Sequence, residues 1–158
     1  MHLRHRQLEK ETGHEAGRSL LAELYREATG KELPPIEKSP HGKPCFLDSP
    51  WHFSITHTKH HAFCVLSRHP VGIDAEETDR KINLRLAEKI LSPKEKLCYE
   101  NAEDKTAALL KLWVLKEAQA KCTGQGIYGY PNQTDFSPDD PRIQQIHGCY
   151  VAVIEETE

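Results

Sequence analysis

The residues from Asp104 to Cys122 form a run that contains neither glycine nor proline and is rich in good helix formers. The run predicts one long helix. Helical spacing places Trp113, Glu117 and Lys121 on one line, so a carboxylate and an ammonium lie side by side, with a second ammonium at Lys116. Apolar side chains at the same spacing form a separate stripe suited to burial: Ala107, Leu110, Val114 and Ala118.

A second stretch, from Val71 to Glu76, predicts a strand that carries two acids. It follows an apolar run of strand length, Ala62–Ser67, and a turn at His69-Pro70. If the stretch is extended, Asp74 and Glu76 project from the same face. Two carboxylates on one face repel each other unless a cation offsets them, and Mg²⁺ prefers carboxylate oxygens. The alternative for both stretches is that these side chains face solvent. Asp74 and Glu76 would then be ordinary surface acids, and Glu117 and Lys121 would form a weak surface ion pair.

Together the two stretches resemble the signature of the 4′-phosphopantetheinyl transferases. That signature reads G-x-D-x-E, followed about forty residues later by W-x-x-K-E-x-x-x-K, and every fixed position is present. Two further segments, Gly42-Lys43-Pro44 and His52–Thr58, resemble the longer, surfactin-type branch, of which this chain looks like a shortened version. The resemblance implies an α+β fold with two similar α/β halves related by a pseudo-twofold axis. We expect these halves at 1–72 and 73–158, within one compact unit.

The activity implied by the resemblance is transfer of 4′-phosphopantetheine from coenzyme A to a serine hydroxyl of an acyl or peptidyl carrier protein, releasing 3′,5′-ADP. Asp74, Glu76 and Glu117 would hold Mg²⁺, which neutralises charge on the diphosphate. Lys121 would contact the leaving phosphate, and Lys116 would assist. Glu117, or a water on the metal, would take the serine proton.

The resemblance also implies contacts with coenzyme A outside the signature. An arginine lies near the start of a helix predicted over 14–29, where the helix dipole favours a phosphate. The G-K-P segment would pack beside the adenine, with its lysine near a phosphate. The family's S-H-S reads T-H-T here, so a hydroxyl and an imidazole would bind phosphate oxygens. The full set of expected coenzyme A contacts is Arg18, Gly42, Lys43, Pro44, Thr56, His57 and Lys121.

Two other kinds of protein remain alternatives. One is a non-catalytic relative that binds coenzyme A or a carrier, although the intact acids and lysines argue against it. The other is a histidine-rich zinc module, because His57, His60 and His61 cluster in the sequence and imidazole is a good zinc ligand. No spacing typical of zinc sites, such as H-E-x-x-H, supports the second alternative.

Length and composition set the remaining expectations. A chain of 158 residues fits one domain, or two small halves that share a core. A hydrophobic fraction of 37% and a net charge of −3 indicate a globular protein with no nucleic-acid partner. No apolar run is long enough to span a membrane. Five cysteines without C-x-x-C spacing favour reduced thiols in a cytoplasmic protein. We expect a monomer, with a dimer as the alternative.

The other segments give simpler predictions. Residues 1–13 are polar and basic and predict a frayed terminus, with Arg4 and Arg6 as weaker candidates for coenzyme A contacts. A short helix is expected over 82–91, and Ser92, Pro93 and Glu95 form a capping box that opens the next helix. These middle helices would face the carrier. Turns are expected over 31–50 and 128–142, and a final strand over 150–154.

Overall fold

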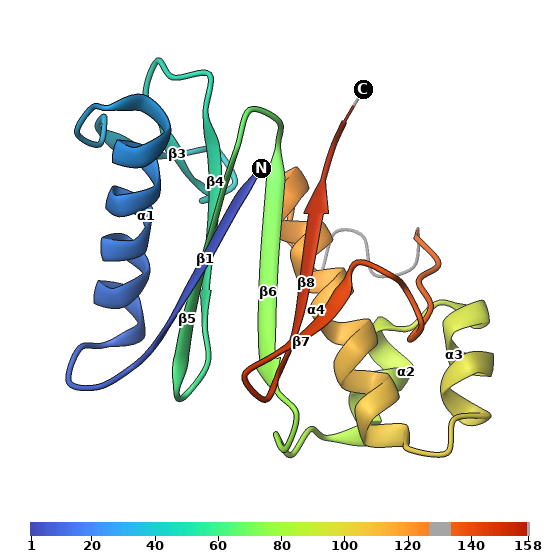
Figure 1. The fold of residues 1–158 in the computed structure, drawn as a ribbon. Helices are drawn as coiled ribbons and strands as arrows, with labels where there is room; N and C mark the ends of the chain where they lie inside the picture. The colour runs from blue at the N-terminus through green and yellow to red at the C-terminus, as the bar shows by residue number, and fades with distance from the viewer. Residues whose placement is uncertain (127–133, 158) are drawn as a thin grey trace.

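A computed structural model describes residues 1–126 and 134–157 (Figure 1). Each half of this structure has a three-stranded antiparallel sheet and one long helix. The first half contains β1 (His2–Gln7), α1 (Gly13–Thr29), β4 (His52–His57) and β5 (His61–Ser67). The second half contains β6 (Val71–Glu77), α4 (Lys105–Thr123), β7 (Ile143–Ile146) and β8 (Cys149–Glu155).

Both halves have the same topology. Each runs strand, helix, strand, strand, and in each sheet the last strand lies in the centre: the orders are β1-β5-β4 and β6-β8-β7. The mixed helix and sheet fold with two similar halves therefore agrees with the expectation. The change of sheet occurs between β5 and β6, so the boundary expected after residue 72 falls within β6, after its second residue.

Smaller elements connect the long ones. The hairpin β2 (Ile36–Lys38) and β3 (Pro44–Phe46) lies within the loop-rich stretch predicted over 31–50. Between β6 and α4 the chain forms the 3₁₀ helix η1 (Leu84–Leu86), α2 (Ala87–Ile90) and α3 (Pro93–Glu100). The predicted capping box of Ser92 and Glu95 is confirmed. Of the turns expected over 128–142, residues 128–133 lie outside the described part of the chain.

Period-two alternation sorts the strand residues into layers. In β5, Ala62, Cys64 and Leu66 pack against α1, whereas Phe63 and Val65 face the second sheet. In β6, Val71, Ile73 and Ala75 face the first sheet, and Gly72 lies against α4. The layers therefore run α1, first sheet, second sheet, α4, with the helices on opposite sides of the molecule (Figure 1).

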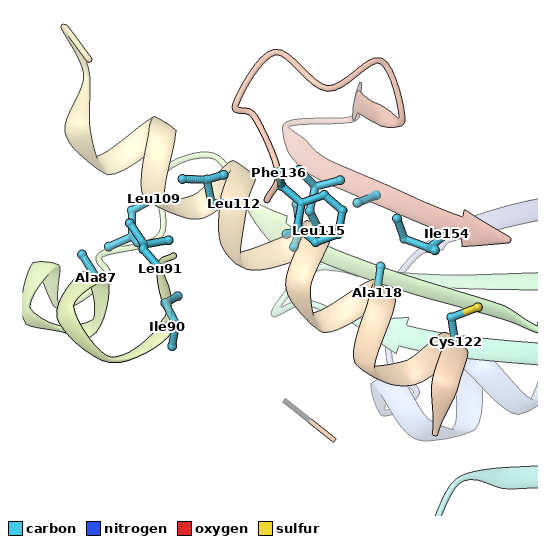
Figure 2. Close-up of a cluster of buried hydrophobic side chains, with 12 residues drawn as sticks. Ala87, Ile90, Leu91, Leu109, Leu112, Leu115, Ala118, Cys122, Phe136 and Ile154 are labelled. Atoms are coloured by element: carbon cyan, nitrogen blue, oxygen red, sulfur yellow. The ribbon is translucent and has the colours of Figure 1, made fainter. Parts of the chain in front are cut away.

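The predicted helix over 104–122 is confirmed as α4. Asp104 is its N-cap and accepts a hydrogen bond from the Ala107 N–H, and Gly124 ends it in the left-handed conformation at φ 75°. Side chains of α4 pack with α2, β8 and Phe136 in the core drawn in Figure 2. Because this core surrounds the helix on more than one side, burial extends beyond the predicted stripe to Leu109, Leu112 and Leu115. Within residues 1–126 and 134–157, no helix is long and apolar enough to cross a membrane.

The prediction of a frayed N-terminus is wrong. Residues 2–7 form β1, which pairs antiparallel with β5 from His2–Leu66 to Gln7–His61. The guanidinium of Arg4 pairs with Glu27 at 2.7 Å, and Arg6 pairs with Glu23. Both arginines therefore bind acids on α1, and polar residues suit this strand because it lies at the edge of its sheet.

Candidate active site

Asp74 is the most buried acid of the candidate site, with 6% of its surface exposed. The Lys121 ammonium donates to its Oδ1 at 2.7 Å and to the backbone carbonyl of Ile73 at 3.2 Å. The Thr56 hydroxyl donates to the same Oδ1 at 3.2 Å. The other carboxylate oxygen, Oδ2, is buried and has no hydrogen-bond partner among the described residues. Asp74 therefore lies where β4, β6 and α4 meet.

Glu76 and Glu117 join Asp74 in a group that we call the carboxylate cluster. Glu76 lies two residues along β6 and is paired with Arg80 and hydrogen-bonded by Trp113. Burial raises the pKa of all three carboxyls, and the charge of Asp74 raises the pKa of Glu76 and Glu117 further. The opposing effects of Lys121 and Arg80 do not cancel these increases. At each of the three carboxyls, burial therefore outweighs the neighbouring cations.

The cluster fits a hard cation in part. Its donors are carboxylate oxygens. The buried Oδ2 of Asp74 has no partner within residues 1–126 and 134–157, although a buried oxygen normally has one. In the described part of the chain, however, no three His, Cys, Asp or Glu side chains are grouped closely enough to form a ready metal site. A bound Mg²⁺ would need further oxygens from a diphosphate and water, as is usual for this ion.

Two hollows flank the carboxylate cluster. The first, the G-K-P hollow, has a volume of about 260 Å³ and is lined by Gly42, Lys43 and Pro44 together with Glu117 and Lys121. The turn that carries Gly42 has a positive φ of 85°, which glycine adopts readily. The structure therefore brings the expected adenine segment beside the signature helix, although Pro44 and Glu117 are 73 positions apart in sequence.

The second hollow, the His57 hollow, has a volume of about 520 Å³. His57 lies at its edge with the acids Glu76 and Glu77 and the cation Arg80. A Cβ built at Gly13 would be 2.3 Å from Cγ of His57, so the first turn of α1 lies directly against the imidazole. His57 thus lies between the positive end of a helix and the carboxylate cluster.

The structure gives the protein neighbours of three further expected residues, Lys116, Lys43 and Arg18. The Lys116 ammonium is buried and pairs with the fully buried Glu95 of α3 at 2.7 Å, away from the carboxylate cluster. The Lys43 ammonium donates to the carbonyls of Val71 and Cys122, at 3.2 and 3.0 Å. Arg18 is half-buried in the second turn of α1 and is not among the residues that line either hollow.

Sequence analysis missed Arg80 and Ser54. Arg80 lines the His57 hollow and pairs with Glu76, and its place four residues after an acid was an available but weak signal. The Ser54 hydroxyl accepts the Ile73 N–H at 3.1 Å and so joins β4 to β6 beside Asp74. The alternation predicted for His52–Thr58 holds, with Phe53 and Ile55 packed toward α1 and Ser54 and Thr56 toward β6.

The fold and this site define an α+β protein built from two β-α-β-β halves, with acids and a lysine clustered where the halves meet. A family model described as "ACPS: 4'-phosphopantetheinyl transferase superfamily" matches residues 70–153, which include β6, α4 and most of β8. The chain therefore belongs to the 4′-phosphopantetheinyl transferase superfamily.

Individual relatives agree with this assignment. The 4'-phosphopantetheinyl transferase psf-1 of Bacillus pumilus is 36% identical over 127 residues, covering 78% of this chain and 53% of the relative. The 4'-phosphopantetheinyl transferase gsp of Aneurinibacillus migulanus is 33% identical over 95 residues, covering 59% of this chain and 39% of the relative. A putative 4'-phosphopantetheinyl transferase of Haemophilus influenzae is 31% identical over 124 residues, covering 75% of this chain and 51% of the relative. The chain spans about half the length of the curated relatives it matches.

Proposed function

We propose that this protein transfers the 4′-phosphopantetheine group from coenzyme A to a serine hydroxyl of an acyl or peptidyl carrier protein, depends on Mg²⁺, and releases 3′,5′-ADP. The observation that carries the proposal is the carboxylate cluster. Asp74 and Glu76 come from a strand and Glu117 from a distant helix. Burial raises the pKa of all three carboxyls, and the charges of Asp74 and Glu76 raise the pKa of Glu117 further. Neighbouring buried acids whose pKa is raised in this way are typical of functional sites.

The residues of the cluster would divide the work. Asp74, Glu76 and Glu117 would hold Mg²⁺ against the diphosphate of coenzyme A. Bound Mg²⁺ supplies positive charge where the breaking phosphoanhydride bond leaves negative charge. Lys121, which is half-buried and pairs with Asp74, would add an ammonium on the same side, next to the departing phosphate. The serine oxygen forms the new bond to phosphorus as the bond to 3′,5′-ADP breaks.

Glu117 is our candidate for the group that takes the serine proton. Burial and the charges of Asp74 and Glu76 raise the pKa of Glu117, which makes its carboxylate a better base. It also lines the G-K-P hollow, so its carboxyl faces the side where coenzyme A would bind. His57 would bind a phosphate oxygen from the opposite hollow, where its imidazole is exposed.

A third hollow suits the carrier. This basic hollow, of about 430 Å³, shares Arg80 with the His57 hollow, so it adjoins the carboxylate cluster. Carrier proteins of this type are acidic around the modified serine, and the hollow provides charge of the opposite sign with apolar contact between. Its cations and apolar residues are Arg80, Lys81, Arg85 and Lys89, with Ile82 and Leu86.

Mass spectrometry of an apo-carrier protein tests the proposed reaction. The protein is incubated with coenzyme A, Mg²⁺ and the apo-carrier, and the gain of one phosphopantetheine per carrier is measured. We expect the carrier to gain one phosphopantetheine with the wild-type protein and none with Glu117→Gln. The control Glu103→Gln changes an exposed acid outside the site, and it should modify the carrier as the wild type does. Coenzyme A binding without transfer supports the non-catalytic alternative. Zinc binding without coenzyme A binding supports the histidine-rich module.

Charge reversal tests the basic hollow separately. Arg85→Glu and Lys89→Glu should raise the KM for the carrier about tenfold each, because a repulsive contact replaces an attractive one. The Kd for coenzyme A should stay unchanged, since neither residue lines the G-K-P hollow or the His57 hollow. Equal loss of affinity for carrier and coenzyme A would show that the substitutions disturb the fold instead.

A further inference from the structure

Three histidines from different parts of the chain lie together at the contact between the two sheets. They are His5 on β1, His61 at the start of β5, and His147 in the turn between β7 and β8. The ring centroids of His5 and His147 are 4.6 Å apart, and those of His61 and His147 are 6.0 Å apart with the rings 18° from parallel. Phe63 lies beside His5 and His61, at 5.8 and 6.3 Å. We call this group the histidine junction.

The strand register explains why two of these histidines share a face. His5 lies opposite Phe63 and Gln7 lies opposite His61 in the β1–β5 pair, so His5, Phe63 and His61 point the same way. That face of the first sheet packs against the second sheet through Phe63 and Val65. The histidine junction therefore lies at the edge of the core that joins the two halves.

The backbone at His147 is unusual for a residue with a side chain. His147 and Gly148 have φ values of 46° and 74° and form the two-residue turn between β7 and β8. Two consecutive positive φ values define a type I′ turn, which strongly favours Asn-Gly or Asp-Gly. A histidine in this conformation is strained, and such strain persists where surrounding contacts hold it. The contacts here are the imidazoles of His5 and His61.

The surroundings favour neutral imidazoles. Burial lowers the pKa of His5, and the proximity of His147 and His61 lowers it further. Burial also lowers the pKa of His61, with His147 and His60 adding to the effect and Glu77 opposing it. The Glu77 carboxylate already accepts hydrogen bonds from Thr58 and the His60 backbone. Nδ1 of His61 is buried, and no described residue forms a hydrogen bond with it.

We propose that the histidine junction makes the contact between the two halves sensitive to acid. Neutral rings stack and hold the turn at His147 on the first sheet. Protonated rings repel one another, so the turn moves away and the two sheets separate at this edge. This inference does not depend on the transfer reaction, because none of the three histidines belongs to the carboxylate cluster.

The sign of the pH effect follows from linkage. The folded protein binds fewer protons at His5 and His61 than the unfolded chain does, because their pKa is lower when folded. The stabilisation is complete above the ordinary histidine pKa of about 6.5 and is lost as the pH falls below that value. Loss of the stacked arrangement should therefore appear as the pH falls below about 6.5.

Thermal unfolding across pH tests the proposal with variants that should fold. His147→Asn keeps a residue suited to the type I′ turn and removes the imidazole. The matched control is His14→Gln, an exposed histidine of α1. We expect the fall in Tm between pH 7.5 and pH 5.5 to be smaller in His147→Asn than in the wild type by about 2–4 °C, and to be unchanged in His14→Gln. Parallel curves for wild type and His147→Asn would overturn the proposal.

A second measurement does not depend on stability. Imidazole proton shifts followed by NMR should show His5 and His61 titrating below the ordinary pKa of about 6.5 in the wild type and moving toward it in His147→Asn. If neither histidine moves when the third imidazole is removed, the three rings do not interact and the proposal fails.

Discussion

Gly72→Ala should destabilise the protein strongly, because the glycine of the G-x-D-x-E motif lies directly against the backbone of α4. A Cβ at Gly72 would be 2.0 Å from the carbonyl oxygen of Ala118 and 2.4 Å from the backbone nitrogen of Cys122. Real Cβ contacts essentially never fall below 3.0 Å. Both neighbours are main-chain atoms, so no change of rotamer can relieve the overlap.

The geometry sets the size of the effect. To restore a contact of 3.0 Å to the Ala118 oxygen, α4 must move by 3.0 − 2.0 = 1.0 Å relative to β6. Overpacking of a core costs about 1–3 kcal/mol, and we expect the upper end because main-chain atoms must shift. For a protein of this length, about 3 kcal/mol corresponds to a fall in Tm of roughly 6–12 °C. The same shift separates Lys121 from Asp74, so transfer activity should fall by about a hundredfold in the protein that remains folded.

Urea unfolding of matched glycine variants measures this cost. Gly17 in α1 is the control, because a Cβ there would meet a side-chain atom, Cγ2 of Ile55, at 2.4 Å. Ile55→Leu removes that branch at constant volume, so it should largely restore the stability of Gly17→Ala. No side-chain change, such as Ala118→Gly, should restore Gly72→Ala. A Gly72→Ala protein within about 0.5 kcal/mol of wild type would refute the reasoning, because that is the range of an ordinary surface substitution.

Four further changes have defined outcomes. Lys116→Ala should lower the free energy of unfolding, measured in urea, by about 3–5 kcal/mol, because the buried carboxylate of Glu95 then has no ammonium beside it. An unchanged free energy of unfolding would contradict a structural role for Lys116. Ser54→Ala should cost about 1–3 kcal/mol by the same assay, because the buried Ile73 N–H loses its acceptor. Glu117→Gln should be more stable than wild type at pH 8 and equal to it near pH 4. The pKa of the wild-type Glu117 carboxyl is raised on folding, so its ionisation destabilises the folded state only at high pH. Urea unfolding at both pH values checks this. Mg²⁺ should raise the Tm of the wild type at pH 8 but not that of Glu76→Gln, and a rise of equal size in both would remove Glu76 from the metal site.

Local pattern was sufficient for most elements of the fold. The signal for α4 was a run without helix breakers, and the aspartate and the glycine that cap this helix are local features as well. The capping box of α3 and the alternation in β4 are local as well. By contrast, β1 was missed because its polar residues are stabilised by pairing with β5 and by ion pairs with α1. Such contacts between distant segments leave no signal in the strand itself.

The candidate site shows the same division. The pairing of Asp74 with Glu76 on one face of a strand, and of Glu117 with Lys121 on one line of a helix, follows from backbone periodicity, so the sequence alone predicted each pair. The partners of Lys116 and Lys43 did not follow, because Glu95 and the backbone carbonyls of Val71 and Cys122 approach them only after the layers have packed.

By itself, the sequence determined which residues could share a face and which family signature they form. Tertiary structure alone decided that Glu117 lies near enough to Asp74 and Glu76 for their charges to raise its pKa, that Thr56 and Lys121 both bind Asp74, and that Arg80 pairs with Glu76. The physical reason is the contact between β6 and α4, where a glycine without a side chain allows a helix to approach a strand closely enough for their charged groups to interact.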